Sequence, residues 1–198
     1  KIRMIYNSVN LSFFSKMNIG TENEKISFIE IASLEKRKGQ MDLLEAFKFL
    51  HMKYDNIRLD FIGIGRDKKL LANYVKKNGL SDSVFFHGFQ SDIRPFLFRN
   101  STVFVLPSYD EGLPITILET MSCEIPAIST NIAGIPEVIE SGINGFLVSP
   151  GNVSQLITYM SFFIDNSGSV RSMGLAGRKK MMGVFDEDKW LEEWKTIL

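Results

Sequence analysis

Short, strongly apolar runs alternate with amphipathic stretches along most of this chain. The apolar runs are rich in β-branched and aromatic residues, which is typical of buried strands. The run at 25–32, for example, is rich in Ile and Phe and is almost continuously apolar toward its end. The predicted strands lie at 25–32, 57–63, 83–88, 102–107, 125–130 and 145–148.

Helical periodicity occupies the stretches between these strands. Within the segment 40–54, apolar residues recur at Met41, Leu44, Phe47 and Leu50, which is the spacing of one helix face. Helices are predicted at 40–54, 67–79, 92–100 and 114–122, as a single turn near 135–140, and from 153 to the end with breaks near 166–168 and near Gly183.

This alternation of strands and helices indicates βαβ units, and therefore an α/β fold with a parallel sheet that helices cover on both faces. Because such crossovers are almost always right-handed, the main candidate is a doubly wound, Rossmann-like domain. Ligands of that architecture bind beyond the carboxyl ends of the strands. The loops expected at that edge are 33–39, 63–67, 87–92, 107–114 and 130–135.

Length and composition are those of an ordinary globular protein. The chain has 198 residues, 44% of them apolar and 23% charged, which suits one domain or at most two small ones. Its formal net charge of zero excludes a protein built for overall attraction to nucleic acid or to an anionic membrane. Any anion-binding site must therefore be built locally.

Other features bear on the compartment and on the completeness of the chain. Cys123 is the only cysteine, so no intrachain disulfide can form, a reducing compartment is favoured, and the thiol is expected in the core. No apolar run approaches the roughly 20 residues that cross a bilayer. The opening KIRMIYNSVN has neither a starting Met nor the order of a signal peptide, and we expect a piece of a longer protein.

Two short motifs favour structural roles over binding roles. Gly63-x-Gly65 follows a strand, but Lys68 occupies the third glycine position of the dinucleotide fingerprint, so a tight turn is favoured over NAD binding. The acidic run 186–188 begins the last helix, where acids suit the helix dipole, and this is favoured over metal binding. The two histidines lack partners at ligand spacing, so no metal site is predicted.

A basic segment lies at the predicted ligand edge, between the first strand and the first helix. Lys36, Arg37 and Lys38 stand there beside Gly39. Alone, this pattern is typical of a solvated surface loop. It gains interest because it shares its edge of the sheet with the segment 110–119.

That second segment, DEGLPITILE, joins a predicted strand to a helix expected to start near Pro114. The unpaired N–H groups of residues 112–116 would then face the crevice, ready for a phosphate. Glu111 in the loop and Glu119 in the helix flank that site, and carboxylates match the paired hydroxyls of a sugar or ribose. A nucleotide diphosphate-sugar satisfies both features; two surface glutamates on a solvated helix are the alternative.

The residues at this edge resemble glycosyltransferase family 4 in their order and spacing. The two-glutamate motif with its flanks is highly specific, and the resemblance extends from about residue 1 to about residue 165. The matching positions are Asn7, Phe13 or Phe14, Lys38-Gly39, Gly63-x-Gly65, Val84-x-Phe86-x-Gly88, Pro107-Ser108, Glu111-Gly112, Glu119, Met121–Pro126, Ala133–Glu137 and Asn144–Val148.

The resemblance implies a GT-B fold, in which two Rossmann-like domains face a cleft and the C-terminal one holds the nucleotide-sugar donor. This chain would be that C-terminal half. Residues 1–20 would end the interdomain linker, and residues 21–183 would form the donor-binding domain. Residues 184–198 would form a helix that crosses back toward the missing N-terminal domain.

The resemblance also implies roles for individual residues. Glu111 would contact the transferred sugar and act with Lys38 in catalysis, and Glu119 would bind the ribose hydroxyls. Lys38 and the N–H groups at the helix start would hold the diphosphate, while the loop 87–90 would lie against the base. The implied donor site comprises Ser33, Lys38, Gly63, Gly65, His87, Gly88, Phe89, Gln90, Glu111, Gly112, Leu113, Pro114 (which has no N–H), Ile115, Thr116 and Glu119.

Three positions depart from the family pattern. Ser33 stands where an Arg that helps to bind diphosphate is common, so we expect weaker stabilisation of the leaving group, or a substitute in Arg37 or Arg66. Glu124 and Ala133 replace glycines and predict local adjustments of the loops.

The activity implied by the resemblance is retaining transfer of a sugar from a nucleotide diphosphate-sugar to an acceptor hydroxyl, without a cofactor or an obligatory metal. The setting would be polysaccharide or glycolipid biosynthesis in the cytoplasm, with peripheral association at the inner face of the membrane. The missing half would bind the glycan or lipid-linked acceptor, so this chain alone would bind nucleotide without transferring sugar. Two alternatives stay open: a non-catalytic module that binds a nucleotide or a partner protein, and a phosphorylase or hydrolase on the same scaffold. The residues do not identify the base, sugar, acceptor or linkage.

Overall fold

A computed structural model describes residues 7–15, 26–97 and 102–196 of the protein. Of the predicted linker, 1–20, it therefore describes only residues 7–15. The strands are β1 (Ile26–Ile31), β2 (Ile57–Ile62), β3 (Val84–Phe86), β4 (Thr102–Leu106), β5 (Ala127–Thr130) and β6 (Gly145–Val148). The helices are η1 (Lys36–Lys38), α1 (Gln40–His51), α2 (Lys68–Lys77), α3 (Arg94–Leu97), α4 (Ile115–Ser122), α5 (Ile135–Val138), α6 (Val153–Asp165), α7 (Gly168–Val184) and α8 (Glu187–Lys195).

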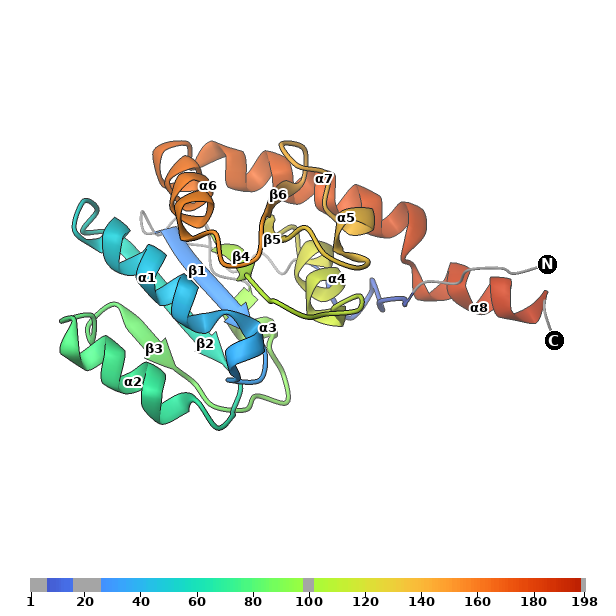
Figure 1. The fold of residues 1–198 in the computed structure, drawn as a ribbon. Helices are drawn as coiled ribbons and strands as arrows, with labels where there is room; N and C mark the ends of the chain where they lie inside the picture. The colour runs from blue at the N-terminus through green and yellow to red at the C-terminus, as the bar shows by residue number, and fades with distance from the viewer. Residues whose placement is uncertain (1–6, 16–25, 98–101, 197–198) are drawn as a thin grey trace.

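A parallel sheet of six strands forms the centre of the fold, in the order β3-β2-β1-β4-β5-β6 (Figure 1). Phe28 in β1 lies opposite Leu59 in β2 and Val103 in β4. The chain builds the sheet outward in one direction from β1 and in the other from β4, so the boundary between these two strands is the switch point at which such sheets bind ligands. The prediction of a doubly wound, Rossmann-like α/β fold is confirmed.

Helices cover both faces of this sheet and enclose two apolar clusters. Around Phe28 and Phe163, α1, α2 and α6 pack over one face. Around Ile29 and Phe104, α4, α5 and the C-terminal end of α7 pack over the other, and Cys123 is buried there as predicted. The clusters lie on opposite sides because successive residues of β1 point to opposite faces of the sheet.

Most predicted elements appear at nearly the predicted residues, but two details differ. Residues 98–100 of the helix predicted at 92–100 lie outside the described residues. The expected loop at 35–39 contains the 3₁₀ turn η1. Pro114 is not the first helical residue; its extended backbone makes it the N-cap of α4. The last break, predicted near Gly183, falls at 185–186, where the N–H of Val9 donates to the Phe185 carbonyl at 2.9 Å.

The described part of the linker lies against the beginning of α8. The N–H of Glu187 donates to the Val9 carbonyl at 3.2 Å, and Asn10 Nδ2 donates to the Glu187 carboxylate at 2.8 Å. Beyond this contact α8 extends away from the sheet, with Leu191 and Trp194 partly exposed (Figure 1). None of the helices in the described residues is both long enough and apolar enough to cross a membrane.

The first apolar cluster makes a direct prediction for stability. Phe163 is fully buried and packs edge-to-face against Phe146, with the ring centroids 5.6 Å apart. Phe163→Ala should lower the free energy of unfolding by about 3–5 kcal/mol, since it removes a buried ring and leaves a cavity. Phe49→Ala is the matched control, because Phe49 is 56% exposed. Urea denaturation should give a change of less than about 0.5 kcal/mol for the control; similar losses for both variants would contradict this core assignment.

Candidate donor-binding site

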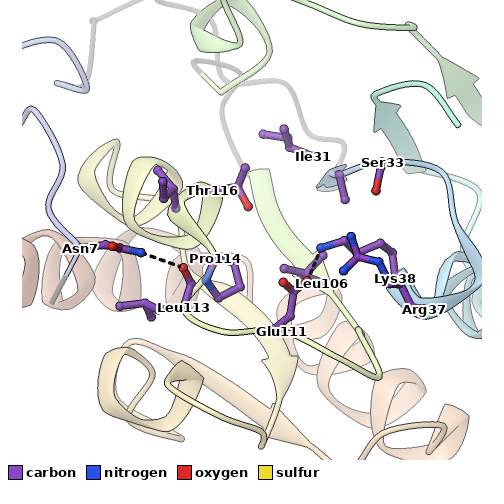
Figure 2. Close-up of a pocket in the computed structure, with 12 residues that line it drawn as sticks. Asn7, Ile31, Ser33, Arg37, Lys38, Leu106, Glu111, Leu113, Pro114 and Thr116 are labelled. Atoms are coloured by element: carbon purple, nitrogen blue, oxygen red, sulfur yellow. Dashed lines mark hydrogen bonds and ion pairs between the residues drawn. The ribbon is translucent and has the colours of Figure 1, made fainter.

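A pocket of about 370 Å³ lies at the switch point, between the carboxyl ends of β1 and β4. The first turn of α4 closes a third side, and Asn7 from the linker reaches the rim, where its side chain donates to the Leu113 carbonyl at 3.3 Å (Figure 2). The lining residues are Asn7, Ile31, Ala32, Ser33, Arg37, Lys38, Leu106, Glu111, Leu113, Pro114, Ile115 and Thr116. The pocket thus gathers the basic segment and the segment 110–119, as the sequence predicted for the ligand edge.

Gly39 brings the basic segment against the end of β4. Its φ of +75° is left-handed, and a Cβ added there would stand only 2.1 Å from the Pro107 carbonyl oxygen. A side chain is therefore excluded both by the backbone conformation and by the space. The close approach places Lys38, the residue before this glycine, beside the loop that follows β4.

Hydrogen bonds from both sides hold the loop that follows β4. The N–H of Tyr109 donates to the Arg37 carbonyl at 2.7 Å, which joins the loop to η1. On the other side, Thr130 Oγ1 donates to the Ser108 carbonyl at 2.8 Å. The loop is therefore fixed before any ligand binds, and the side chains that it carries are preorganised.

Lys38 and Glu111 meet in an ion pair inside the pocket. Lys38 Nζ lies 2.5 Å from Glu111 Oε1 (Figure 2). Ser108 Oγ donates to the same oxygen at 2.8 Å. The two charged side chains are only 12% and 8% exposed, so water screens their charges weakly. The two residues predicted to be catalytic thus lie together, with the ammonium group still able to donate two further hydrogen bonds.

The first turn of α4 offers unpaired donors to the same pocket. Its N-cap, Pro114, has no N–H and no capping side chain. Among the described residues, no hydrogen bond uses the N–H of Ile115 or of Thr116. These donors and the positive end of the helix dipole form a site for an anion.

Glu119 lies one turn further along α4. Its side chain is half-buried, and this burial raises the pKa of the carboxyl above the ordinary value for glutamate. No hydrogen bond or ion pair from a described residue reaches it, and it is not among the residues that line the pocket. A carboxyl that is partly desolvated and unpaired is suited to accept hydrogen bonds from ligand hydroxyls beside the pocket.

Gly63 and Gly65 support the pocket from behind rather than line it. A Cβ on Gly63 would stand 2.0 Å from the Ala32 carbonyl oxygen, and one on Gly65 would stand 2.2 Å from that of Leu34. Both glycines therefore allow the turn after β2 to pack on the turn after β1. This is the structural role that the sequence favoured over dinucleotide binding.

The loop predicted to face the base is held by the sheet and also lies outside the pocket lining. His87 Nε2 lies 2.5 Å from the buried Asp60 carboxylate, and Gln90 Nε2 donates to the His87 carbonyl at 2.9 Å. Gly88 turns the chain with a φ of +70°, and Phe89 is 72% exposed. The loop therefore presents an aromatic face to the solvent at the ligand edge.

The structure also places the other residues that the sequence offered as candidates for metal or diphosphate binding. The acidic run 186–188 contributes Glu187 and Asp188 to the first turn of α8, which is the helix role that was favoured. Within the described ranges, no three His, Cys, Asp or Glu side chains gather as a metal site requires. Arg37 lines the pocket, whereas Arg66 does not.

Sequence reasoning missed Glu30, a buried acid of β1 that lies next to the pocket. Gln40 Nε2 donates both to Glu30 Oε1 and to the Ser33 carbonyl, each at 3.0 Å, which ties the pocket loop to β1. Glu30 Oε2 is buried without a hydrogen-bond partner. Burial raises the pKa of this carboxyl well above its usual value, and the nearby Lys38 ammonium opposes the shift. The available signal was one acid inside a strand whose other residues, apart from Ser27, are apolar.

Comparison with known proteins identifies the family. The model of the family described as glycosyl transferases group 1 matches residues 13–180, which is most of the chain. The chain belongs to the group 1 glycosyl transferases. The resemblance inferred from the motifs is thereby confirmed at the level of this family.

Individual relatives of this glycosyl transferase chain support the same family assignment. An uncharacterized glycosyltransferase of Haemophilus influenzae is 30% identical over 176 residues, which are 88% of this chain and 49% of that protein. The N-acetyl-alpha-D-glucosaminyl L-malate synthase of Bacillus anthracis is 28% identical over 204 residues, covering 99% of this chain and 53% of that protein. The chain therefore spans about half the length of these relatives.

Solved structures share the fold of this glycosyl transferase chain. Sucrose-phosphate synthase from Thermosynechococcus elongatus has a TM-score of 0.87 at 20% identity, with 98% of this chain and 51% of that chain covered. Anabaena Alr3699/HepE in complex with UDP and glucose has the same TM-score and identity, with 98% and 56% covered. The Rossmann-like sheet of this chain is thus the one found in glycosyltransferases.

The buried acid Glu30 predicts how stability depends on pH. Because burial favours its neutral form, the folded protein keeps this proton at pH values where the unfolded chain, with a pKa near 4.5, has released it. The free energy of unfolding should therefore fall as the pH rises above that value and through the higher pKa of the folded state.

Glu30→Gln keeps the acceptor oxygen for Gln40 but cannot ionise. Its stability relative to wild type should increase steadily with pH across that window, as measured by urea denaturation at a series of pH values. Parallel stability curves for the two proteins would show that Glu30 ionises as freely in the folded protein as in the unfolded chain.

Proposed function

We propose that this chain is the donor-binding, C-terminal half of a retaining GT-B glycosyltransferase of family 4. The full protein transfers a sugar from a nucleotide diphosphate-sugar to an acceptor hydroxyl in polysaccharide or glycolipid biosynthesis. It works in the cytoplasm, at or near the inner face of the membrane, without a cofactor or an obligatory metal. Since the chain spans about half the length of its relatives, the acceptor side belongs to the other half.

One observation carries this proposal. The Lys38 ammonium and the unpaired N–H groups of Ile115 and Thr116 line one pocket at the switch point of the sheet. That combination of a cation and a helix start suits a diphosphate. The presence of UDP in a structure of Anabaena Alr3699/HepE, which shares this fold, is consistent with a nucleoside diphosphate as the ligand.

The same groups account for catalysis by electrostatic stabilisation. The bond between the anomeric carbon and the diphosphate breaks, the electron pair leaves with the diphosphate, and the acceptor oxygen bonds to that carbon while its proton passes to an oxygen of the departing diphosphate. Lys38 and the start of α4 face the charge that develops on the leaving group. A charge-assisted hydrogen bond contributes about 1.5–3 kcal/mol and a helix terminus about 0.3–2 kcal/mol, which together amount to a few powers of ten in rate.

Glu111 and Glu119 complete the donor site on either side of the diphosphate. Glu111 is held by Lys38 and Ser108 through one oxygen, Oε1, which leaves Oε2 to accept hydrogen bonds from the transferred sugar. Glu119 accepts from the ribose hydroxyls. The outward-facing loop at 87–90 lies against the base.

Nucleotide binding tests this proposal directly. The 198-residue chain should bind at least one of UDP, GDP and ADP in isothermal titration calorimetry, and it should transfer no sugar by itself, because it lacks the acceptor half. Absence of binding by all three nucleotides at millimolar concentration would refute the assignment.

The role of Glu119 is tested with the preferred nucleotide and its 2′-deoxy analogue. Glu119→Ala should weaken the ribonucleotide about 10- to 100-fold, which is the effect of losing charge-assisted hydrogen bonds. The variant should change the affinity for the 2′-deoxy form much less, because that form lacks the diol. Glu45→Ala, at an exposed acid of α1 that does not line the pocket, is the control and should bind both ligands like wild type. Equal losses of affinity for the two ligands in Glu119→Ala would contradict the proposed contact between Glu119 and the ribose hydroxyls.

A further inference from the structure

We propose that Arg37 is a second diphosphate-binding cation of this pocket. On ligand binding, its guanidinium gives up the ion pair with Glu35 and donates to the phosphates. This inference rests on the proposed function and decides between the two substitutes, Arg37 and Arg66, that the sequence left open for the arginine replaced by Ser33. Arg37 occupies the middle of η1 and lines the pocket beside Lys38.

The first argument is the balance of charge. Among the described residues that line the pocket, the charged side chains are Arg37, Lys38 and Glu111. Lys38 and Glu111 neutralise each other at 2.5 Å, so the pair carries no net charge. A diphosphate brings at least one negative charge on each phosphate, and Arg37 is the lining residue whose charge is left to offset it.

The second argument is the position of the Arg37 backbone. Its carbonyl accepts the Tyr109 N–H at 2.7 Å, and the Tyr109 hydroxyl donates to Asp42 Oδ2 at 2.6 Å. The bond to Asp42, together with burial, raises the pKa of Tyr109 to about 12. The root of the Arg37 side chain is thus fixed at the rim while its guanidinium can turn.

The third argument is that the ion pair between Arg37 and Glu35 is weak. Arg37 Nε donates to Glu35 Oε2 at 3.0 Å, with the two side chains 46% and 34% exposed. Exposed ion pairs contribute little to stability because water screens them and their side chains lose freedom. The two terminal nitrogens of Arg37 have no partner among the described residues. The planar fork that they form suits phosphate oxygens better than a lysine ammonium does.

Lys36 gives a matched control within the same turn. It is exposed, carries the same charge as Arg37, and is not among the residues that line the pocket. Removing either residue therefore changes the net charge of η1 equally, and only Arg37 should change the contacts with a ligand.

The experiment compares Arg37→Ala, Arg37→Lys and Lys36→Ala with wild type by calorimetry. The probes are the tightest-binding of UDP, GDP and ADP, and the corresponding nucleoside without phosphates. Arg37→Ala should lower the affinity for the nucleoside diphosphate about 10- to 100-fold and leave the affinity for the nucleoside unchanged. The affinity of Arg37→Lys for the diphosphate should fall between those of Arg37→Ala and wild type. The affinity of Lys36→Ala should lie within about twofold of that of wild type.

Glu35→Gln gives an independent test that keeps the arginine. Removing the competing carboxylate should raise the affinity for the diphosphate severalfold and leave the affinity for the nucleoside unchanged. The inference is overturned if Arg37→Ala binds the diphosphate as Lys36→Ala does, or if it loses diphosphate and nucleoside equally, which would indicate a structural role. Those results leave the proposed function intact, whereas failure of wild type to bind any of the three nucleotides would overturn both.

Discussion

The ion pair between Lys38 and Glu111 joins two loops whose residues stand 73 positions apart in the sequence. One loop follows β1 and the other follows β4, and the sheet order makes these strands neighbours at the switch point. The close approach of Gly39 to the Pro107 carbonyl sets the distance between the loops, and the Tyr109–Arg37 hydrogen bond holds it. The site therefore exists before a ligand binds, as electrostatic stabilisation of a leaving group requires.

Acidic groups near the pocket are arranged so that they do not cancel its attraction for anions. Glu111 is paired with Lys38, and burial raises the pKa of the Glu30 carboxyl well above its usual value, which favours its neutral form. Glu119 stands beside the pocket rather than inside it. Among the described residues that line the pocket, no unpaired carboxylate opposes the positive start of α4 and the Arg37 guanidinium. This explains how a chain of zero net charge can build a local anion site between two glutamates.

The pattern of apolar residues was sufficient to predict the parallel sheet and nearly all of its helices, because buried strands and amphipathic helices carry their own periodicity. The motif around Glu111 predicted the pocket, with Lys38 in it. What the sequence did not reveal depends on contacts between distant segments. Such contacts occur at the η1 turn, where the Tyr109 N–H donates to the Arg37 carbonyl, and at the break at 185–186, where the Val9 N–H donates to the Phe185 carbonyl. Glu30 was overlooked because nothing local marks a strand acid as the partner of Gln40.

A crystal structure of this chain with a bound nucleoside diphosphate is the most direct test of the account. Phosphate oxygens should lie within about 3.2 Å of Lys38 Nζ and of the backbone nitrogens of Ile115 and Thr116. A diphosphate seated instead on the turn at 63–67, or elsewhere on the surface with the Lys38 pocket unoccupied, would contradict the account.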